Sequence, residues 1–508
     1  MATPEATENY FKRLKHKNIP NHAIRILGKT HLHVASIGFG GYRIHYNSIE
    51  HARALRYALL NGFNLIDTSS NYTDGGSEML IGNLLHEMFE RQEISRDEVI
   101  VVSKVGYVQG QNMKLAQQKE ADGEAFPEMV KYMDGCWHCL HPEFLEDQLS
   151  RSLERLHLSY LDVYLLHNPE YFLSLAKKNN GVEMESGRTE YYRRIKSAFE
   201  WLEEKVAEGK IKAYGVSSNT FPVSSLDFEF TSLERLIEIA HEITSSHYFR
   251  VIQFPFNLFE ACACLKKNQK RDTKTLLELA AEEQIGTLVN RPLNAMGQNG
   301  MVRLASFRET EAKEVEREFT QTLGSLQTLE SQFKRKFFKE TPAEMREILE
   351  DTFSLAPQLK NALHAFENWH HWDHVKQNVI WPRSVSALNY LDEKLRANEP
   401  WKNWSDSYAV TLHALLDAIS KQYENAAQKR SNEISTRLDK REVLLQSSET
   451  LSQKALQILT SVQGVDCTLL GMRKTPYVED ALVALTRPSV PRAGDFLKNF
   501  ATMNIQPS

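Results

Sequence analysis

The sequence has few cysteines and no long apolar run. Five cysteines among 508 residues are too few for a disulfide framework, which favours a reduced, intracellular protein, and we expect it in the cytoplasm. No apolar stretch approaches the ~18 residues needed to span a bilayer, and the polar N-terminal segment lacks the apolar core of a secretory signal. A net charge of -5 gives no excess of basic residues. We therefore expect neither nucleic-acid nor membrane partners.

The sequence also lacks a Gly-x-Gly-x-x-Gly string after a strand, which is typical of a Rossmann nucleotide site. It shows instead an alternation of short apolar runs with amphipathic stretches of helical period, such as Pro142 to Leu156. The apolar runs predict eight strands, at 34–39, 63–66, 99–103, 161–166, 211–216, 250–254, 285–289 and 467–470. Eight strand–helix pairs predict an α/β protein with a (β/α)8 TIM barrel rather than a six-stranded doubly wound sheet. Before them, Ile24 to Val34 predicts an N-terminal hairpin that turns at Gly28 and Lys29.

The alternation breaks after the seventh strand. From about 303 to 449 the sequence has helical period only, as in Phe319, Leu323, Leu326, Phe333 and Phe337, which share one helix face. Five of the seven tryptophans lie in this block, which indicates either a small core of its own or a surface packed on the barrel mouth. We expect 20–302 and 450–490 to form the barrel and 303–449 to be a helical insertion over its mouth. A smaller insertion, 107–141, follows strand three.

Four polar residues stand where expected strands end. Asp67 ends strand two, Tyr72 lies in the following loop, and Lys104 and His167 end strands three and four. Barrel enzymes build their active sites at this end of the strands. A tyrosine can donate a proton near neutrality if an ammonium lowers its pKa and a carboxylate holds the ammonium. This set suits the reduction of a carbonyl, although each residue alone also has an ordinary structural explanation.

Five segments, in order along the chain, resemble the aldo-keto reductases: Gly28 to Arg43, Asn64 to Gly82, Ser152 to Pro169, Glu208 to Asn219 and Leu469 to Lys474. Each string alone is weak evidence, but five in order with these residue types at strand ends are strong. The resemblance implies that Tyr72 is the proton donor, that Asp67 and Lys104 tune it, and that His167 orients the carbonyl.

The resemblance also implies a nicotinamide cofactor. Ser217, Ser218, Asn219 and Gln253 match residues that hold the nicotinamide carboxamide, and one inserted residue leaves both Ser217/Asn219 and Ser218/Asn219 as possible pairs. Gly471, Arg473 and Lys474 match the loop that binds the adenosine phosphates. Arg473 is suited to pairing with a 2′-phosphate, which favours NADP(H) over NAD(H).

Two places depart from that pattern, and two others resemble zinc sites. Asn290 stands where the family has an aromatic residue that stacks on the nicotinamide, and Arg291 can pair with the pyrophosphate or form a structural ion pair. Glu479, Asp480 and Ala481 replace the expected Glu-Asn pair for the adenine. Cys136, His138, Cys139 and His141, and likewise His370, His371 and His374, only partly match zinc-site spacing, so we expect no metal.

These observations predict an NADP(H)-dependent oxidoreductase that interconverts a small-molecule aldehyde or ketone and an alcohol, with Tyr72 as general acid and base. The alternative is a cofactor-binding regulatory or redox-sensing subunit with little turnover, which the missing aromatic residue and the helical block also fit. The helical insertion is a candidate docking site for a protein partner.

Overall fold

The computed structural model describes residues 1–179, 181–297, 300–395, 398–445 and 450–501. The chain divides into two compact units. One comprises Met1–Ala295 with Leu444–Ser508, and the other comprises Met296–Val443. The sequence placed the borders of the insertion at 303 and 449, a few residues later at both ends.

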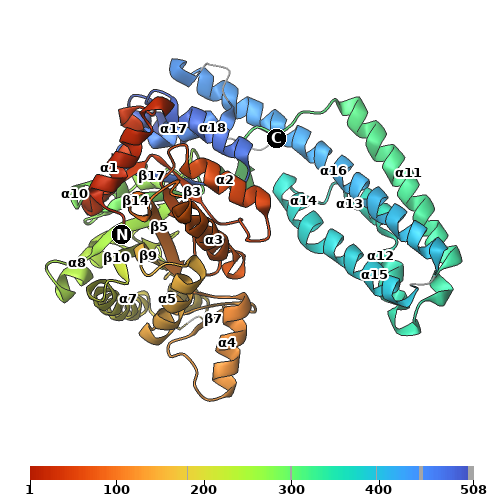
Figure 1. The fold of residues 1–508 in the computed structure, drawn as a ribbon, viewed down its shortest axis with the longest axis horizontal. Helices are drawn as coiled ribbons and strands as arrows, with labels where there is room; N and C mark the ends of the chain where they lie inside the picture. The colour runs from red at the N-terminus through yellow and green to blue at the C-terminus, as the bar shows by residue number, and fades with distance from the viewer. Residues whose placement is uncertain (180, 298–299, 396–397, 446–449, 502–508) are drawn as a thin grey trace. The chain divides into compact units, whose positions relative to one another are not determined.

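The first unit is built around a closed barrel of eight parallel strands, surrounded by helices (Figure 1). In spatial order the strands are β3 (Ile37–Gly40), β4 (Leu65–Asp67), β5 (Ile100–Val105), β9 (Leu161–His167), β10 (Ile211–Ser217), β11 (Phe249–Pro255), β14 (Gly286–Asn290) and β17 (Cys467–Leu470). Every neighbouring pair is parallel. The expected (β/α)8 barrel is thereby confirmed, and the doubly wound sheet is excluded.

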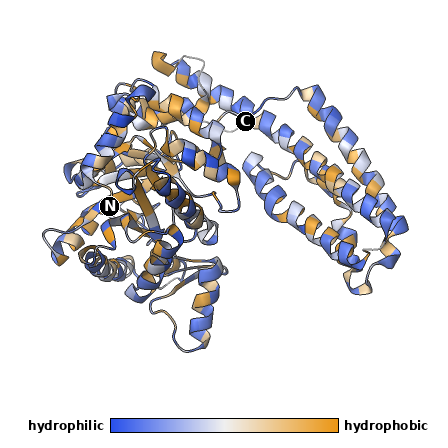
Figure 2. Cartoon of the chain, viewed as in Figure 1, coloured by the Kyte–Doolittle hydropathy of each residue, from blue (hydrophilic) through white to orange (hydrophobic). Residues whose placement is uncertain are grey.

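The strands read as apolar runs because both of their faces are buried. Side chains such as Val102, Val163, Leu165 and Val251 have no exposed surface and form one cluster in the barrel. The barrel strands are accordingly among the hydrophobic parts of the ribbon in Figure 2. The helices of this unit include α2 (Ile49–Leu59), α3 (Gly76–Glu90), α5 (Pro142–Leu156), α6 (Tyr171–Lys178), α7 (Met184–Ala207), α8 (Leu233–Ile243), α10 (Leu276–Glu282), α17 (Leu451–Thr460), α18 (Thr475–Thr486) and α19 (Ala493–Ala501). The short helix α9 (Cys262–Leu265) and the strand pair β12 (Lys267–Gln269) and β13 (Lys274–Thr275) follow β11.

The N-terminal hairpin is confirmed, with β1 (Ile24–Ile26) antiparallel to β2 (His33–Ala35). Gly28 in its turn has φ +47°, and a Cβ there would lie 2.3 Å from the backbone nitrogen of Gly286. The expected strand 34–39 is wrong in one respect, because it is two strands: its first residues pair in the hairpin and only β3 enters the barrel. The sequence also missed helix α1 (Pro4–Arg13), which buries Tyr10 and Phe11.

The insertion after β5 folds as a small antiparallel sheet with one helix. It contains β6 (Tyr107–Val108), α4 (Gly110–Ala121), β7 (Val130–Met133) and β8 (Cys136–His138), and the sheet order is β6-β8-β7. This sheet places Tyr107 and His138 next to His167 at the end of β9.

The two-stranded sheet of β15 (Asn294–Gly297) and β16 (Gly300–Arg303), which the sequence did not indicate, lies at the start of the second unit, and β15 crosses the border between the units. The described remainder of the second unit is helical. Its helices are α11 (Ala312–Lys336), α12 (Arg346–Thr352), α13 (Leu355–Ala362), α14 (Trp369–Val375), the π-turn η8 (Lys376–Ile380), α15 (Trp381–Lys394) and α16 (Glu399–Asp439). Trp372, Trp401 and Trp404 are buried in one cluster with Leu326 and Phe333. The tryptophans therefore belong to a core of the helical unit itself.

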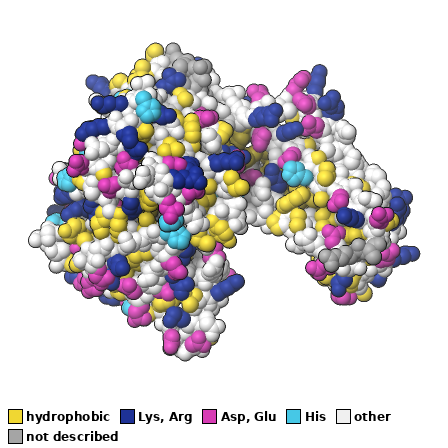
Figure 3. All heavy atoms as spheres, in the orientation of Figure 1, with side chains coloured by type: hydrophobic (Ala, Val, Ile, Leu, Met, Phe, Trp, Pro, Cys, Tyr) yellow, Lys and Arg dark blue, Asp and Glu magenta, His cyan; other side chains and the backbone are white. Residues whose placement is uncertain are grey.

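The surface carries charges of both signs. Acidic and basic side chains are interspersed over the face shown in Figure 3. Across the described ranges, no helix combines the length and the apolar character that crossing a bilayer requires.

Candidate active site

Asp67, Tyr72 and Lys104 meet at the C-terminal ends of β4 and β5. Asp67 ends β4, Lys104 is the penultimate residue of β5, and Tyr72 begins the 3-10 turn η4 (Tyr72–Gly75). Lys104 Nζ donates to Asp67 Oδ2 at 2.8 Å, to the Thr68 carbonyl at 2.6 Å and to Tyr72 Oη at 3.1 Å. An ammonium has three protons, so each has an acceptor and the position of Nζ is fixed.

Burial dominates the ionisation of these three groups. It lowers the pKa of Lys104 and raises the pKa of Asp67, while the attraction between the two acts against both shifts. It also raises the pKa of Tyr72 well above 10, and the charge of Asp67 adds to that rise. From the sequence we expected a lowered pKa, but the net shift is upward, and desolvation of the phenolate is its largest cause. Tyr72 therefore keeps its proton at neutral pH, as a proton donor must.

His167 ends β9 and faces the same site. Its Nδ1 lies 3.1 Å from Ser69 Oγ, and its ring meets the Tyr72 ring edge-on with the centroids 5.9 Å apart. Burial, followed by the charge of Lys104, lowers the pKa of His167 well below 6.5. The imidazole is therefore neutral at pH 7, and only one of its ring nitrogens carries a proton. In this state it can hold a substrate oxygen by a hydrogen bond.

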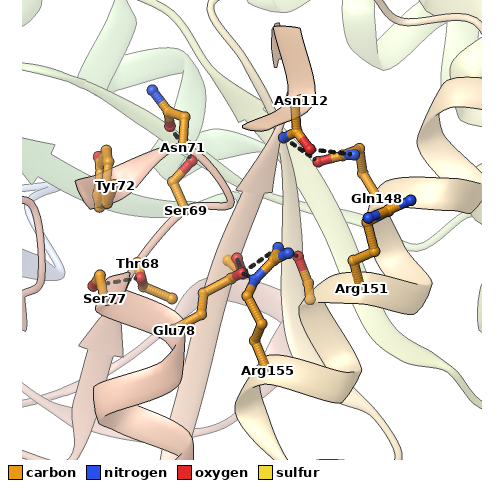
Figure 4. Close-up of polar contacts among 12 residues, drawn as sticks. Thr68, Ser69, Asn71, Tyr72, Ser77, Glu78, Asn112, Gln148, Arg151 and Arg155 are labelled. Atoms are coloured by element: carbon orange, nitrogen blue, oxygen red, sulfur yellow. Dashed lines mark hydrogen bonds and ion pairs between the residues drawn. The ribbon is translucent and has the colours of Figure 1, made fainter. Parts of the chain in front are cut away.

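The residues that position His167 were missed by the sequence analysis. Ser69 Oγ donates to Asn71 Oδ1 at 2.7 Å, beside Tyr72 (Figure 4). From the small sheet, His138 Nε2 donates to the main-chain carbonyl of His167 at 2.7 Å, and the Tyr107 ring packs 4.7 Å from the His167 ring. These contacts depend on how the insertion folds back on β9, which no local pattern reveals.

The same insertion carries one of the strings weighed as a zinc site. His138 is bonded to the main-chain carbonyl of His167, and Cys136 and Cys139 are free thiols. Among the residues described, no three His, Cys, Asp or Glu side chains gather as metal ligands.

A buried ion pair supports β5 from outside the barrel. Glu78 of α3 accepts from Ser103 Oγ at 2.5 Å and from Arg155 Nε of α5 at 2.7 Å (Figure 4). Adjacent residues in a strand point to opposite faces, so Ser103 holds the strand from one side while Lys104 projects from the other. Glu78 and Arg155 thus fix the strand that carries the catalytic candidate Lys104.

Two of the residues assigned to the carboxamide lie beside Asp67. Ser217 Oγ donates to Gln253 Oε1 at 3.2 Å, and Gln253 Nε2 donates to Asp67 Oδ1 at 2.8 Å. Ser218 is instead occupied within its own loop, where its hydroxyl lies 3.1 Å from that of Thr220. Of the two serines, the structure therefore places Ser217 at the site.

Asn219 has an exposed side chain, and its backbone nitrogen donates to Glu170 Oε1 at 2.9 Å. Glu170 is a further residue that the sequence did not single out. Burial raises the pKa of its carboxyl to about 7, and its Oε2 is buried without a hydrogen-bond partner in the described chain. The loop after β10 therefore rests on a titratable group.

Asn290 and Arg291 stand at the end of β14, where the sequence departs from the family pattern. Arg291 forms an ion pair with Glu260 at 3.0 Å, so the structural ion pair that the sequence suggested is present. Asn290, at the position where an aromatic was expected, donates from Nδ2 to Gln253 Oε1 at 3.4 Å.

Gly471, Arg473 and Lys474 lie in the loop between β17 and α18. Gly471 is exposed, Arg473 and Lys474 are half-buried, and Lys474 Nζ lies 3.7 Å from Glu50 Oε2. Asp480, near the expected adenine position, accepts hydrogen bonds from Thr450, Ser452 and Gln453 of the α17 region. It therefore joins two helices instead of standing free.

Comparison with known proteins agrees with this geometry. The family model described as "Aldo/keto reductase family" matches residues 36–356, more than half of the chain. The chain is 27% identical over 160 residues to the NADH-specific methylglyoxal reductase of Escherichia coli, which covers 31% of this chain and 37% of that protein. It is 27% identical over 248 residues to the uncharacterized oxidoreductase YtbE of Bacillus subtilis, which covers 48% of this chain and 68% of that protein.

Among solved structures, an aldo/keto reductase from Klebsiella pneumoniae in complex with NADP and acetate is 14% identical, with a TM-score of 0.42, over 96% of this chain and 98% of that one. The match to the methylglyoxal reductase of Escherichia coli spans only about a third of that protein's length. The family model, however, includes seven of the eight barrel strands, all except β17, and the four candidate residues Asp67, Tyr72, Lys104 and His167. The chain therefore belongs to the aldo/keto reductase family of oxidoreductases.

Proposed function

We propose that the chain is an NADP(H)-dependent oxidoreductase that interconverts an aldehyde or ketone and an alcohol, with Tyr72 as the general acid and base. The observation that carries the proposal is the position of Lys104 Nζ, which bonds Asp67, the Thr68 carbonyl and Tyr72 Oη at once. A protonated phenol beside a fixed ammonium is the arrangement that proton transfer to a developing alkoxide requires.

In the direction of reduction, the Tyr72 hydroxyl holds the carbonyl oxygen of the substrate. His167 Nε2 also donates to that oxygen when Ser69 Oγ donates to Nδ1, because the ring proton of the neutral imidazole is then on Nε2. The nicotinamide, when bound, supplies the hydride that reduces the carbonyl carbon. As negative charge develops on the oxygen, Tyr72 transfers its proton, and the resulting phenolate is stabilised by Lys104, 3.1 Å away. Asp67 keeps Lys104 charged in spite of its burial. A general acid of this kind contributes about 10²–10⁴-fold to the rate.

The cofactor we propose is NADP(H) rather than NAD(H). Arg473 and Lys474 directly precede α18, and cations beside a helix N-terminus suit a phosphate group. Gly471 leaves the backbone of the loop exposed for such a group. At the other end of the site, Ser217 and Gln253 surround Asp67, where the reactive ring has to lie. All five cysteines are free, which suits a reducing compartment such as the cytoplasm.

We further propose that the helical unit Met296–Val443 controls access of the small-molecule substrate or docks a protein partner. The chain enters this unit a few residues after Asn290, which belongs to the site, so its attachment point is close to the chemistry. The unit has its own core and contributes none of the proposed catalytic residues. Long insertions of this kind at barrel mouths commonly serve specificity or gating.

Steady-state oxidation of NADPH and of NADH by the purified chain, with a panel of aldehydes and ketones, tests the proposed activity. We expect turnover with at least one carbonyl class and a preference for NADPH. Tight binding of NADPH without turnover of any substrate would contradict the enzyme proposal and support the regulatory or redox-sensing alternative.

A further inference from the structure

Gln253 uses both ends of its side-chain amide within the protein. Its Oε1 accepts from Ser217 Oγ at 3.2 Å and from Asn290 Nδ2 at 3.4 Å, and its Nε2 donates to Asp67 Oδ1 at 2.8 Å. An amide oxygen has two lone pairs, so Oε1 has none left for another donor. The side chain is also buried, with 1% of the residue exposed. The residue that sequence reasoning assigned to the carboxamide therefore serves Asp67.

Asn290 is the neighbouring residue with an acceptor to spare. Its Nδ2 is used by Gln253, but its Oδ1 is buried and has no hydrogen-bond partner in the part of the chain that the structure describes. A buried acceptor without a hydrogen bond is unfavourable for the folded state. The backbone at this point is held, because the Asn290 carbonyl accepts from the Phe256 nitrogen at 3.2 Å. A donor for Oδ1 is therefore expected to come from a ligand.

We propose that Asn290 Oδ1 accepts the amide N–H of the nicotinamide in this chain and that Gln253 is a positioning residue for Asp67. The inference rests on the proposed function, since it concerns how the same cofactor is held. Asparagine has no ring that could stack on the nicotinamide. At this position the chain would therefore recognise the nicotinamide by a hydrogen bond, where the family pattern has a stacking aromatic residue. Through Gln253, the residue that binds the cofactor amide is joined directly to the carboxylate that holds Lys104.

Calorimetric binding of NADP⁺ and of its 3-acetylpyridine analogue tests the first half of this inference. The analogue carries an acetyl group in place of the carboxamide and so has no N–H donor. We expect the wild-type chain to bind NADP⁺ about tenfold more tightly than the analogue, which corresponds to one hydrogen bond to a buried acceptor. Asn290→Leu, of similar size, should bind both ligands alike. Preserved discrimination in Asn290→Leu, or in Asn290→Ala if the leucine variant misfolds, would overturn the assignment.

The matched control is Gln253→Met, which retains the length of the side chain and removes its hydrogen bonds. We expect it to discriminate between the two ligands as the wild type does. The acidic limb of its pH profile for carbonyl reduction should move to higher pH, because Asp67 loses a donor that favours its charged form. Loss of discrimination in Gln253→Met, with discrimination retained in Asn290→Leu, would show that Gln253 and not Asn290 binds the carboxamide. Absence of any NADP⁺ binding would overturn the proposed function itself. NADP⁺ binding whose discrimination against the analogue is unchanged in the Asn290 variants would overturn only this inference.

Discussion

Ser69 Oγ bridges His167 Nδ1, at 3.1 Å, and Asn71 Oδ1, at 2.7 Å. Because the imidazole is neutral, the partner on Nδ1 decides which ring nitrogen carries the proton and how the ring faces the substrate. Ser69 is thus a positioning residue for the group that holds the substrate oxygen.

We expect Ser69→Ala to lower kcat for carbonyl reduction by about fivefold, since a single hydrogen bond contributes ~1 kcal/mol. Steady-state kinetics with saturating cofactor measure the effect. The neighbouring Ser70 provides a matched control, because its Oγ is buried without a partner among the described residues. Equal activities of Ser69→Ala and Ser70→Ala would argue against a positioning role for Ser69.

Lys104→Met should reduce stability as well as activity. The side chains of Lys104 and Asp67 are 0% and 5% exposed, so the substitution leaves a buried carboxylate without its cation. Removing one partner of a buried ion pair typically costs about 3–5 kcal/mol. Urea unfolding at pH 7 measures the loss, and the double variant Asp67→Asn/Lys104→Met should recover part of it. A single variant as stable as the wild type would show that the pair is not desolvated.

The helical unit should lose stability as the pH rises. Glu330 of α11 is buried and accepts from the Ala356 nitrogen at 3.0 Å, and burial raises the pKa of its carboxyl from 4.5 to about 7. Above pH 4.5 the unfolded chain releases a proton that the folded chain retains, so stability falls up to about pH 7 and then levels off.

Glu330→Gln keeps an acceptor oxygen and cannot ionise. At pH 8 we expect it to be more stable than the wild type by about 2–3 kcal/mol, with little difference at pH 4.5. Thermal unfolding followed by tryptophan fluorescence reports mainly on this unit, which holds five of the seven tryptophans. A difference that is the same at both pH values would exclude titration of Glu330 as its cause.

Replacement of residues 303–449 by a short Gly/Ser linker tests the role of the helical unit. If the unit controls access to the site, KM values and the range of substrates should change while NADPH still binds and the far-UV spectrum still shows a folded barrel. Unchanged kinetics in a folded deletion variant would rule out a lid and leave the docking of a partner as the role to pursue.

The barrel was predictable because its strands are buried on both faces. Each of them reads as a short apolar run, and the runs at 211–216 and 467–470 match β10 and β17 to within a residue. Asp67, Tyr72 and Lys104 were placed together by the same reasoning, since the ends of parallel strands meet at one rim. Helix α1 was missed because it is short and mostly polar, with Tyr10 and Phe11 as the only large apolar side chains that it buries.

The remaining features depend on tertiary contacts that residue types do not reveal. The contacts of His138 and Tyr107 with His167 exist only because the small sheet folds back on β9. Gln253 has the residue type expected of a carboxamide ligand, but its oxygen is shared between Ser217 and Asn290. The net rise in the pKa of Tyr72 also follows from burial, whose extent the sequence does not show.

The role of Tyr72 as the proton donor is the central claim, and carbonyl reduction by Tyr72→Phe tests it most directly. The substitution removes one hydroxyl and leaves the ring, so NADPH binding should change little, whereas stability should fall because the buried Lys104 ammonium loses one of its three acceptors. We predict a loss of kcat/KM of about 10²–10⁴-fold across the aldehydes and ketones that the wild type reduces. A Phe variant that binds NADPH and reduces those carbonyls as fast as the wild type would contradict the account.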